Sequence, residues 1–150
     1  MALKARIKDE MKAALLSGDR FVGETLRNLT AAILDEEVKL GKRDEGLSDE
    51  EIEKVVAREV KKRNESAKIY RDNNRPDLAE PEEREIEILQ AYLPKQLDET
   101  ELVAIIEVKI AELGVTGPQA MGQVIDAVKK QVGNAADGAA IARIVKQKLN

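Results

Sequence analysis

The side chains that could do chemistry in this chain are carboxylates, lysines, arginines and two tyrosines, because its 150 residues include no histidine and no cysteine. This composition excludes Ser-His-Asp and Cys-His nucleophilic machinery, and also zinc or iron–sulfur sites that need His or Cys ligands. The carboxylates are densest in EPEEREIE, residues 80–87. Catalytic carboxylates need burial or a like-charged neighbour, and an exposed first helical turn explains these acids more simply. We therefore expect no catalytic residue, no metal site and no cofactor.

The best candidate for a binding site is the turn GNAADG at residues 133–138, because a helix is expected to begin after it. Free backbone N–H groups at a helix N-terminus can bind a phosphate, and a glycine there lets another backbone approach closely. The candidate phosphate-binding residues are Lys129, Lys130, Asn134, Gly138, Arg143 and Lys146. An ordinary tight turn capped by Asp137, with the lysines in solvent, is the alternative interpretation.

Charge is distributed unevenly along the chain, whose net charge is −4. Residues 119–150 carry five basic side chains and two acidic ones, an excess of three positive charges at the C-terminal end. The acidic chain as a whole is not an electrostatic binder of nucleic acid, so we expect any contact with a polyanion here. A second basic group lies between Arg58 and Arg71, but Glu59 and Glu65 interleave with it and favour a solvated helix face.

Aliphatic residues recur at helical spacing along the whole chain, and aromatic residues make up only 2% of it. This pattern predicts an all-α protein. Ser48 and Glu51 have the spacing of a capping box, and a helix is expected to start at Pro76 or Pro81. The polar segment at residues 41–47 predicts a mobile loop. The buried stripes of the first two helices are predicted to be Leu3, Ile7, Met11 and Leu15, and then Val22, Leu26, Leu29, Ile33 and Leu40.

The Tyr-Leu-Pro sequence at residues 92–94 stops the N-terminal run of helices. We expect an N-terminal helical bundle or hairpin domain at residues 1–97 and a small three-helix domain at residues 98–150. Gly122 falls inside the middle helix of the second domain, where a glycine costs about 1 kcal/mol relative to alanine. It indicates close approach of another backbone or of RNA, or close packing between two helices.

The compartment and the membrane relationship are predicted from hydropathy. Charged residues run from Lys4 to Lys12 with no apolar segment after them, which is not typical of a signal peptide. No stretch approaches the ~20 apolar residues that span a bilayer. We expect a soluble, cytoplasmic protein without a membrane partner.

Three blocks of sequence indicate one family. They are LRNLTAAILDEEV at residues 26–38, the segment 61–97 with its DLAEPEEREIEILQAYLPKQL portion, and residues 121–149 with MGQVIDAVKK and ADGAAIARIVKQKL. Together these blocks resemble the YqeY family. This family shares a domain with the tail of GatB, the B subunit of tRNA-dependent amidotransferases. The resemblance implies a tail that sits on tRNA and helps position Glu-tRNA(Gln) or Asp-tRNA(Asn) for amidation. Similar domains are appended to some glutaminyl-tRNA synthetases, and stand-alone members are grouped with carbon–nitrogen ligases that use glutamine as amido-N-donor.

The chain departs from the family pattern at four places. Family members usually carry basic residues where this chain has Gln123, Asn134, Ala135 and Ala139, so we expect its binding of tRNA to be weak. We expect a non-catalytic, tRNA-associated accessory module that works with an aminoacyl-tRNA synthetase or an amidotransferase. An amidotransferase acting alone is disfavoured, because the chain has no Gly-rich phosphate loop and no amidase-like Ser/Lys arrangement. A helical protein–protein interaction module without RNA binding is the alternative.

Overall fold

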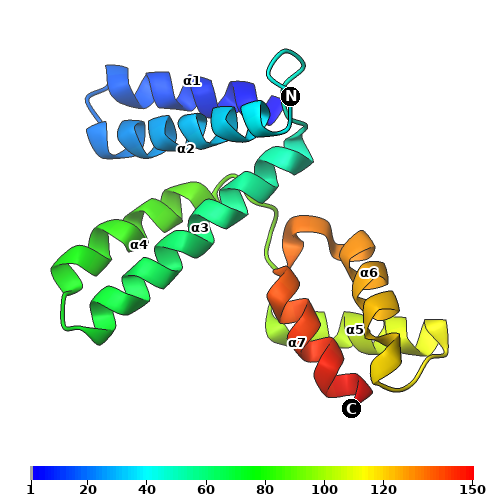
Figure 1. Ribbon diagram of the computed structural model, residues 1–150. Helices are drawn as coiled ribbons and strands as arrows, with labels where there is room; N and C mark the ends of the chain where they lie inside the picture. The colour runs from blue at the N-terminus through cyan, green and yellow to red at the C-terminus, as the bar shows by residue number, and fades with distance from the viewer. Residues whose placement is uncertain (1) are drawn as a thin grey trace. The chain divides into compact units, whose positions relative to one another are not determined.

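The computed structural model describes residues 2–150, which form seven α-helices and two short 3-10 helices with no strand among them (Figure 1). The predicted all-α fold is confirmed. The chain divides into two compact units, of which the first ends at Leu93 and the second runs from Pro94 to Asn150. The sequence places the boundary after residue 97 instead. Leu97 belongs to the second unit because it packs against that unit's core and its N–H donates to the Ala135 carbonyl at 2.8 Å.

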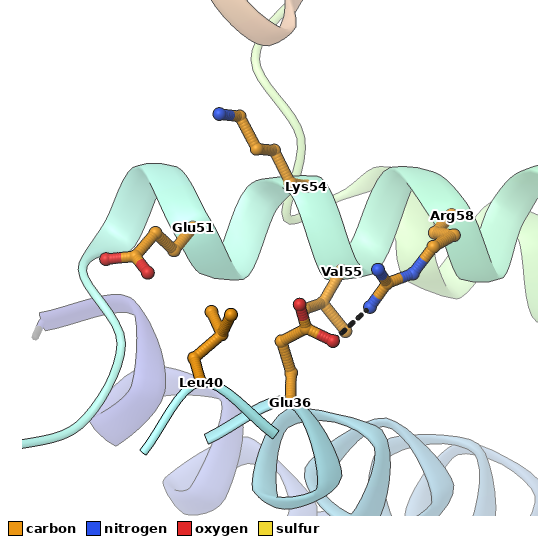
Figure 2. A pocket seen from close by; sticks show the side chains of 6 residues that line it. All are labelled: Glu36, Leu40, Glu51, Lys54, Val55 and Arg58. Carbon is orange, nitrogen blue, oxygen red and sulfur yellow. Dashed lines mark hydrogen bonds and ion pairs between the residues drawn. The ribbon is translucent and has the colours of Figure 1, made fainter. Parts of the chain in front are cut away.

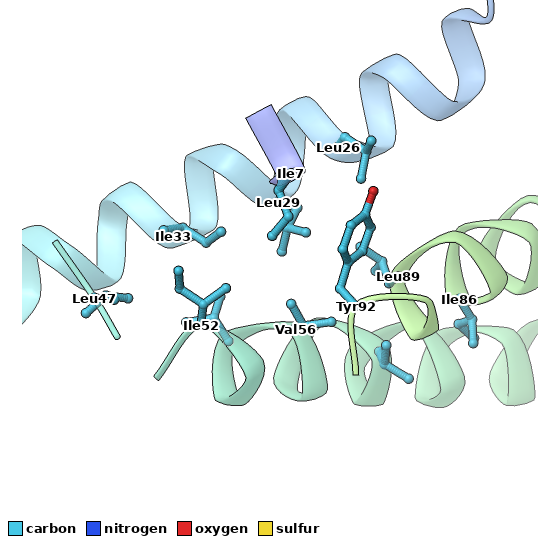
Figure 3. Close-up of a cluster of buried hydrophobic side chains, with 12 residues drawn as sticks. Ile7, Leu26, Leu29, Ile33, Leu47, Ile52, Val56, Ile86, Leu89 and Tyr92 are labelled. Atoms are coloured by element: carbon cyan, nitrogen blue, oxygen red, sulfur yellow. The ribbon is translucent and has the colours of Figure 1, made fainter. Parts of the chain in front are cut away.

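The first unit is built from two helical hairpins (Figure 1). Helix α1 (Ala2–Leu16) packs along α2 (Arg20–Lys39), and α3 (Asp49–Asp72) packs along α4 (Pro76–Gln90). Apolar stripes of all four helices meet in one core, of which Figure 3 shows a part. The core residues are Ile7, Leu26, Leu29, Ile33, Leu47, Ile52, Val55, Val56, Val60, Ile86, Leu89 and Tyr92.

Two residues of the predicted stripes are exposed, and Leu3, Met11 and Val22 are partly buried. Leu40 is 47% exposed, because α2 ends at Lys39 and Leu40 is its C-cap. Leu15 is also exposed; it lies against the buried Gly23, where a β-carbon would come within 2.4 Å of its Cδ2 atom. Gly23 therefore lets α1 and α2 approach closely near their connection.

The segment between α2 and α3 is anchored, although the sequence predicts a mobile polar loop. Leu47 is fully buried, and its N–H donates to Oε2 of Glu37 at 3.2 Å. Glu37 is itself only 1% exposed and also accepts from Nζ of Lys4 at 2.6 Å. One buried carboxylate thus joins α1, α2 and the loop. The predicted capping box of Ser48 and Glu51 is present at the start of α3.

Tyr92, from the Tyr-Leu-Pro stop, is a core residue that ties the end of α4 to α1. Its hydroxyl donates to the Glu10 carboxylate, and the Arg6 guanidinium lies 4.8 Å from its ring centroid. Burial and the hydrogen bond to Glu10 raise the pKa of Tyr92. The same hydrogen bond lowers the pKa of Glu10, and Arg6 adds to this effect.

The second unit contains three α-helices around its own aliphatic core. They are α5 (Glu99–Leu113), α6 (Met121–Val132) and α7 (Gly138–Leu149), with short 3-10 turns at Pro118–Ala120 and Gly133–Ala135. A capping box of Asp98 and Glu101 starts α5. Of the residues that periodicity places on the buried stripe of α6, Val128 is fully buried, whereas Met121, Ile125 and Val132 are only partly buried. Val124, which that stripe does not include, is also fully buried. The buried residues are Leu102, Ile106, Ala120, Val124, Val128, Ile141, Ile144, Val145 and Leu149.

Candidate nucleic-acid interface

The turn between α6 and α7 is fixed by hydrogen bonds to the start of the second unit. Gly133 ends α6 with φ 55° and ψ −130°, a conformation that favours glycine. The next residue, Asn134, is partly buried, and its carbonyl accepts from Nε2 of Gln96 at 3.0 Å. The neighbouring carbonyl of Ala135 accepts from Leu97. Asn134 therefore serves to anchor the turn through its backbone.

The first turn of α7 has no side-chain cap. Asp137 occupies the N-cap position with extended backbone, φ −75° and ψ 135°, but its side chain makes no capping hydrogen bond. The predicted position of Asp137 at the N-cap is therefore confirmed, but its side chain does not make the capping hydrogen bond. At the caps Ser48 and Asp98 a glutamate at N3 completes a reciprocal pair, whereas Ala140 holds that position here and offers no such partner. The first N–H groups of α7 thus receive no oxygen from their N-cap side chain.

The Lys129 side chain lies beside this helix start. The place that a β-carbon would occupy on Gly138 is 3.5 Å from Cε and 3.6 Å from Nζ of Lys129. The structure therefore brings together two of the predicted site residues from different helices. Within residues 2–150, no backbone atom from outside α7 and its flanking residue lies within 4 Å of that position, and an alanine there would make only ordinary van der Waals contact.

Lys129, Lys130 and Lys146, which we call the lysine trio, are exposed and form no ion pair within residues 2–150. Lys129 and Lys130 lie in the last turn of α6, and Lys146 lies in the last turn of α7. Lysines at the last turn of a helix also stabilise its dipole, so their position alone does not indicate a ligand.

Arg143 differs from the lysine trio because a carboxylate already holds it. Its Nη1 atom lies 2.9 Å from Oε1 of Glu99 on α5, and both side chains are more than half exposed. A second ion pair, Lys148 with Glu107 at 2.8 Å, joins the same two helices. Sequence reasoning missed Glu99, because no local pattern signals a contact between helices 44 positions apart (143 − 99).

Gly122 lies in the first turn of α6 and faces open space. It is exposed, and a β-carbon there would meet nothing within 4 Å. The prediction of close helix packing at Gly122 is therefore wrong within residues 2–150, because the helix turns this position away from the core. Approach of RNA or of another backbone to Gly122 stays a prediction. Helical spacing places Gly122 on the same face of α6 as Asp126 and Lys129.

The other charged groups noted in the sequence lie in the first unit and are largely occupied by ion pairs. The basic group between Arg58 and Arg71 agrees with a solvated, paired helix face. Arg63 contacts Glu85 at 2.6 Å and Glu59 at 3.3 Å. These pairs engage part of the acidic segment at residues 80–87 as well. The remaining pairs of the basic group are Arg58–Glu36, Lys62–Glu59, Lys68–Asp72 and Arg71–Glu83.

A cleft of about 210 Å³ between α2 and α3 is lined by Glu36, Leu40, Glu51, Lys54, Val55 and Arg58 (Figure 2). Glu36 pairs with Arg58 at 3.0 Å, and Glu51 pairs with Lys42 at 2.9 Å. The hydrogen bond from Lys42 lowers the pKa of Glu51. In Figure 2 the Lys54 side chain points away from the other lining residues. The cleft therefore offers a ligand few uncommitted polar groups.

Two further kinds of feature are absent from residues 2–150. No group of three or more acidic side chains there is placed to hold a metal ion. In the same residues, each helix is too short or too polar to cross a membrane.

The fold and the site define a class of small all-helical proteins with two units, of which the second places one exposed lysine beside an uncapped helix start. Residues 4–149 match the model of the family described as Yqey-like protein, and the chain belongs to this YqeY family. The resemblance found in the sequence is thereby confirmed.

The chain is similar to fungal proteins named altered inheritance of mitochondria protein 41, mitochondrial. The protein from Lachancea thermotolerans is 30% identical over 128 residues, which cover 84% of this chain and 66% of the relative. The protein from Clavispora lusitaniae is 33% identical over 101 residues, covering 65% and 57%. The protein from Eremothecium gossypii is 32% identical over 89 residues, covering 59% and 48%. The matched region thus spans about half to two thirds of the length of these relatives.

Proposed function

We propose that this chain is a non-catalytic accessory protein that binds tRNA weakly through its second unit. The observation that carries the proposal is the Lys129 ammonium beside the uncapped start of α7. Backbone N–H groups and the positive end of the helix dipole attract a phosphate, and a nearby ammonium adds a charge-assisted contact. Lys130 and Lys146 would extend the contact to neighbouring phosphates of the same backbone.

The binding is proposed to be weak because few cations are available. The lysine trio is unpaired within residues 2–150, but Arg143 is held by Glu99. Each phosphate contact adds affinity by releasing a counterion, so three contacts give modest binding that depends on salt. A partner that itself binds tRNA, such as an aminoacyl-tRNA synthetase or an amidotransferase, would raise the effective concentration of this surface.

The relation to amidotransferases rests on the resemblance to the tail of GatB. We propose a role in positioning the tRNA and not in the glutamine-dependent formation of a carbon–nitrogen bond. Acids of the segment 80–87 support this choice: Glu83 pairs with Arg71, and Glu85 pairs with Arg63. Glutamine-dependent turnover by the purified chain alone would contradict it.

Filter binding with the full chain and a tRNA transcript at about 50 mM salt tests the proposal. The variant Lys129→Ala/Lys130→Ala is compared with Lys8→Ala/Lys12→Ala, which removes two exposed lysines of α1 and changes the net charge equally. We expect the first variant to weaken binding roughly tenfold or more, and the control to change it less than about twofold. Absence of binding by the unmodified chain, or equal losses in the two variants, would contradict the proposal.

A second candidate function is a helical protein–protein interaction module without RNA binding. Leu34 and Val38, one turn apart on α2, are 43% and 57% exposed, and Val108 on α5 is 57% exposed. Aliphatic side chains that are this exposed to solvent favour contact with a partner protein. A stable partner that stays bound after RNase treatment, together with absence of tRNA binding, would favour this candidate over the first.

The compartment we propose is the cytoplasm. The matched relatives are named as mitochondrial proteins, and a mitochondrial location is the alternative. Fractionation of the source cells, followed by immunodetection, would distinguish a cytoplasmic location from an organellar one.

A further inference from the structure

The ion pair between Arg143 and Glu99 occupies the one arginine among the proposed tRNA-binding residues. Nη1 of Arg143 lies 2.9 Å from Oε1 of Glu99, and the side chains are 51% and 64% exposed. An ion pair that is this exposed contributes little to stability and can open in solution. The carboxylate engages the guanidinium through Nη1 and places a negative charge beside it, so a phosphate that approaches Arg143 competes for that donor and is repelled by Glu99.

We propose that Glu99 is an internal competitor that keeps Arg143 from phosphate and so holds the RNA affinity of the second unit low. This inference rests on the proposed function, because it concerns the same surface. A phosphate that takes the donors around Nη1 must displace Glu99, and one that binds the remaining donors of Arg143 meets the repulsion of the Glu99 carboxylate. Removal of the Glu99 charge should therefore tighten RNA binding by about two- to fivefold, the range that an exposed ion pair supplies.

The neighbouring pair of Lys148 and Glu107 provides a matched control. It joins the same two helices at 2.8 Å, with side chains 37% and 55% exposed. Glu99→Gln and Glu107→Gln each remove one negative charge from α5, so long-range attraction of RNA increases similarly in both. Lys148 is not among the proposed tRNA-binding residues. If Glu99→Gln raises the affinity for RNA more than Glu107→Gln does, the difference therefore measures the release of Arg143.

Glu99→Gln is not expected to disturb the fold. The capping box that starts α5 is made by Asp98 and Glu101, and both groups remain in the variant. The Glu99 side chain faces solvent beyond its contact with Arg143. Far-UV circular dichroism and thermal melting of each variant will verify that helix content is retained before RNA binding is compared.

A double-mutant cycle on the full chain tests the inference, with a tRNA transcript as the probe at about 50 mM salt. The proteins are the unmodified chain, Glu99→Gln, Arg143→Ala, the double variant and Glu107→Gln. We expect Glu99→Gln to tighten binding about two- to fivefold, and Glu107→Gln less than about 1.5-fold. Arg143→Ala should lower the affinity for the transcript less than about twofold in the unmodified chain. In the Glu99→Gln background the same substitution should abolish the gain in affinity.

Each outcome of this cycle bears on a different claim. If Glu99→Gln and Glu107→Gln tighten binding equally, or if Arg143→Ala costs the same in both backgrounds, the competitor role of Glu99 is wrong. The proposed function stands in that case, provided that Lys129→Ala/Lys130→Ala still weakens binding. If no protein in the set binds the transcript, both the proposed function and the competitor role are wrong.

Discussion

Replacement of Glu37 by alanine should destabilise the first unit more than a typical change of a charged residue. Glu37 is 1% exposed, and its Oε2 atom accepts from both Lys4 and Leu47. Removal of the carboxylate leaves the buried N–H of Leu47 without this acceptor, which costs about 1–3 kcal/mol. Lys4 is 25% exposed and can turn to water, so no buried unpaired charge is left. Because the missing side chain also leaves a cavity, we expect the free energy of unfolding of the first unit to fall by about 2–3 kcal/mol.

Urea denaturation followed by tyrosine fluorescence measures this loss in the first unit alone. Both tyrosines of the chain, Tyr70 and Tyr92, belong to that unit, and the chain has no tryptophan. Glu37→Gln retains a side-chain oxygen for the Leu47 N–H and should cost less than Glu37→Ala.

Glu36→Ala is the matched control, because Glu36 precedes Glu37 on α2 and forms a more exposed ion pair with Arg58. We expect this control to lose less than about 1 kcal/mol. The reasoning is refuted if Glu37→Ala loses no more than Glu36→Ala. It is also refuted if Glu37→Gln is as damaging as Glu37→Ala.

Three further predictions concern a glycine, a tyrosine and the lysine trio. Gly122→Ala should stabilise the second unit by about 0.5 kcal/mol, because the position is helical and open; a loss in chemical denaturation would contradict this. The hydrogen bond from Tyr92 lowers the pKa of Glu10 below 4.5, its value in the unfolded chain. The ionised Glu10 side chain therefore stabilises the fold above pH 4.5, and this stabilisation is lost as the pH falls. Stability measured between about pH 6 and pH 3 should therefore fall less in Tyr92→Phe than in the unmodified chain. If the lysine trio contacts three phosphates, the slope of log affinity against log salt should be about −2.7, and about −0.9 in Lys129→Ala/Lys130→Ala; equal slopes would contradict those contacts.

The helices and most of the core could be predicted from the sequence, because aliphatic periodicity and capping signals are local. The box of Ser48 and Glu51 and the buried stripe of Leu26, Leu29 and Ile33 are examples. Leu40 was harder, because burial near a helix end depends on where the last turn stops. Periodicity alone also does not choose between Val124 and Ile125 as the inward residue of α6.

Contacts between segments distant in the sequence could not be predicted in this way. In the sequence, Glu37 is indistinguishable from the many acidic residues of the surface. Only the packing of α1 and of the loop against Glu37 shows that this side chain is buried. The contact of Lys129 with Gly138 depends on the path of the turn between two helices. The sequence shows that Asp137 can occupy the N-cap of α7, but it does not show which way the side chain turns. The absence of the capping hydrogen bond could therefore not be predicted.

Amide chemical-shift mapping of the isotope-labelled full chain with a tRNA transcript at low salt tests RNA binding by the second unit most directly. We predict that the largest perturbations fall at residues 129–130, 133–140 and 143–146, and that they fade as salt is raised. Perturbations concentrated on α1 to α4, or an unchanged spectrum at saturating tRNA, would contradict the proposed surface.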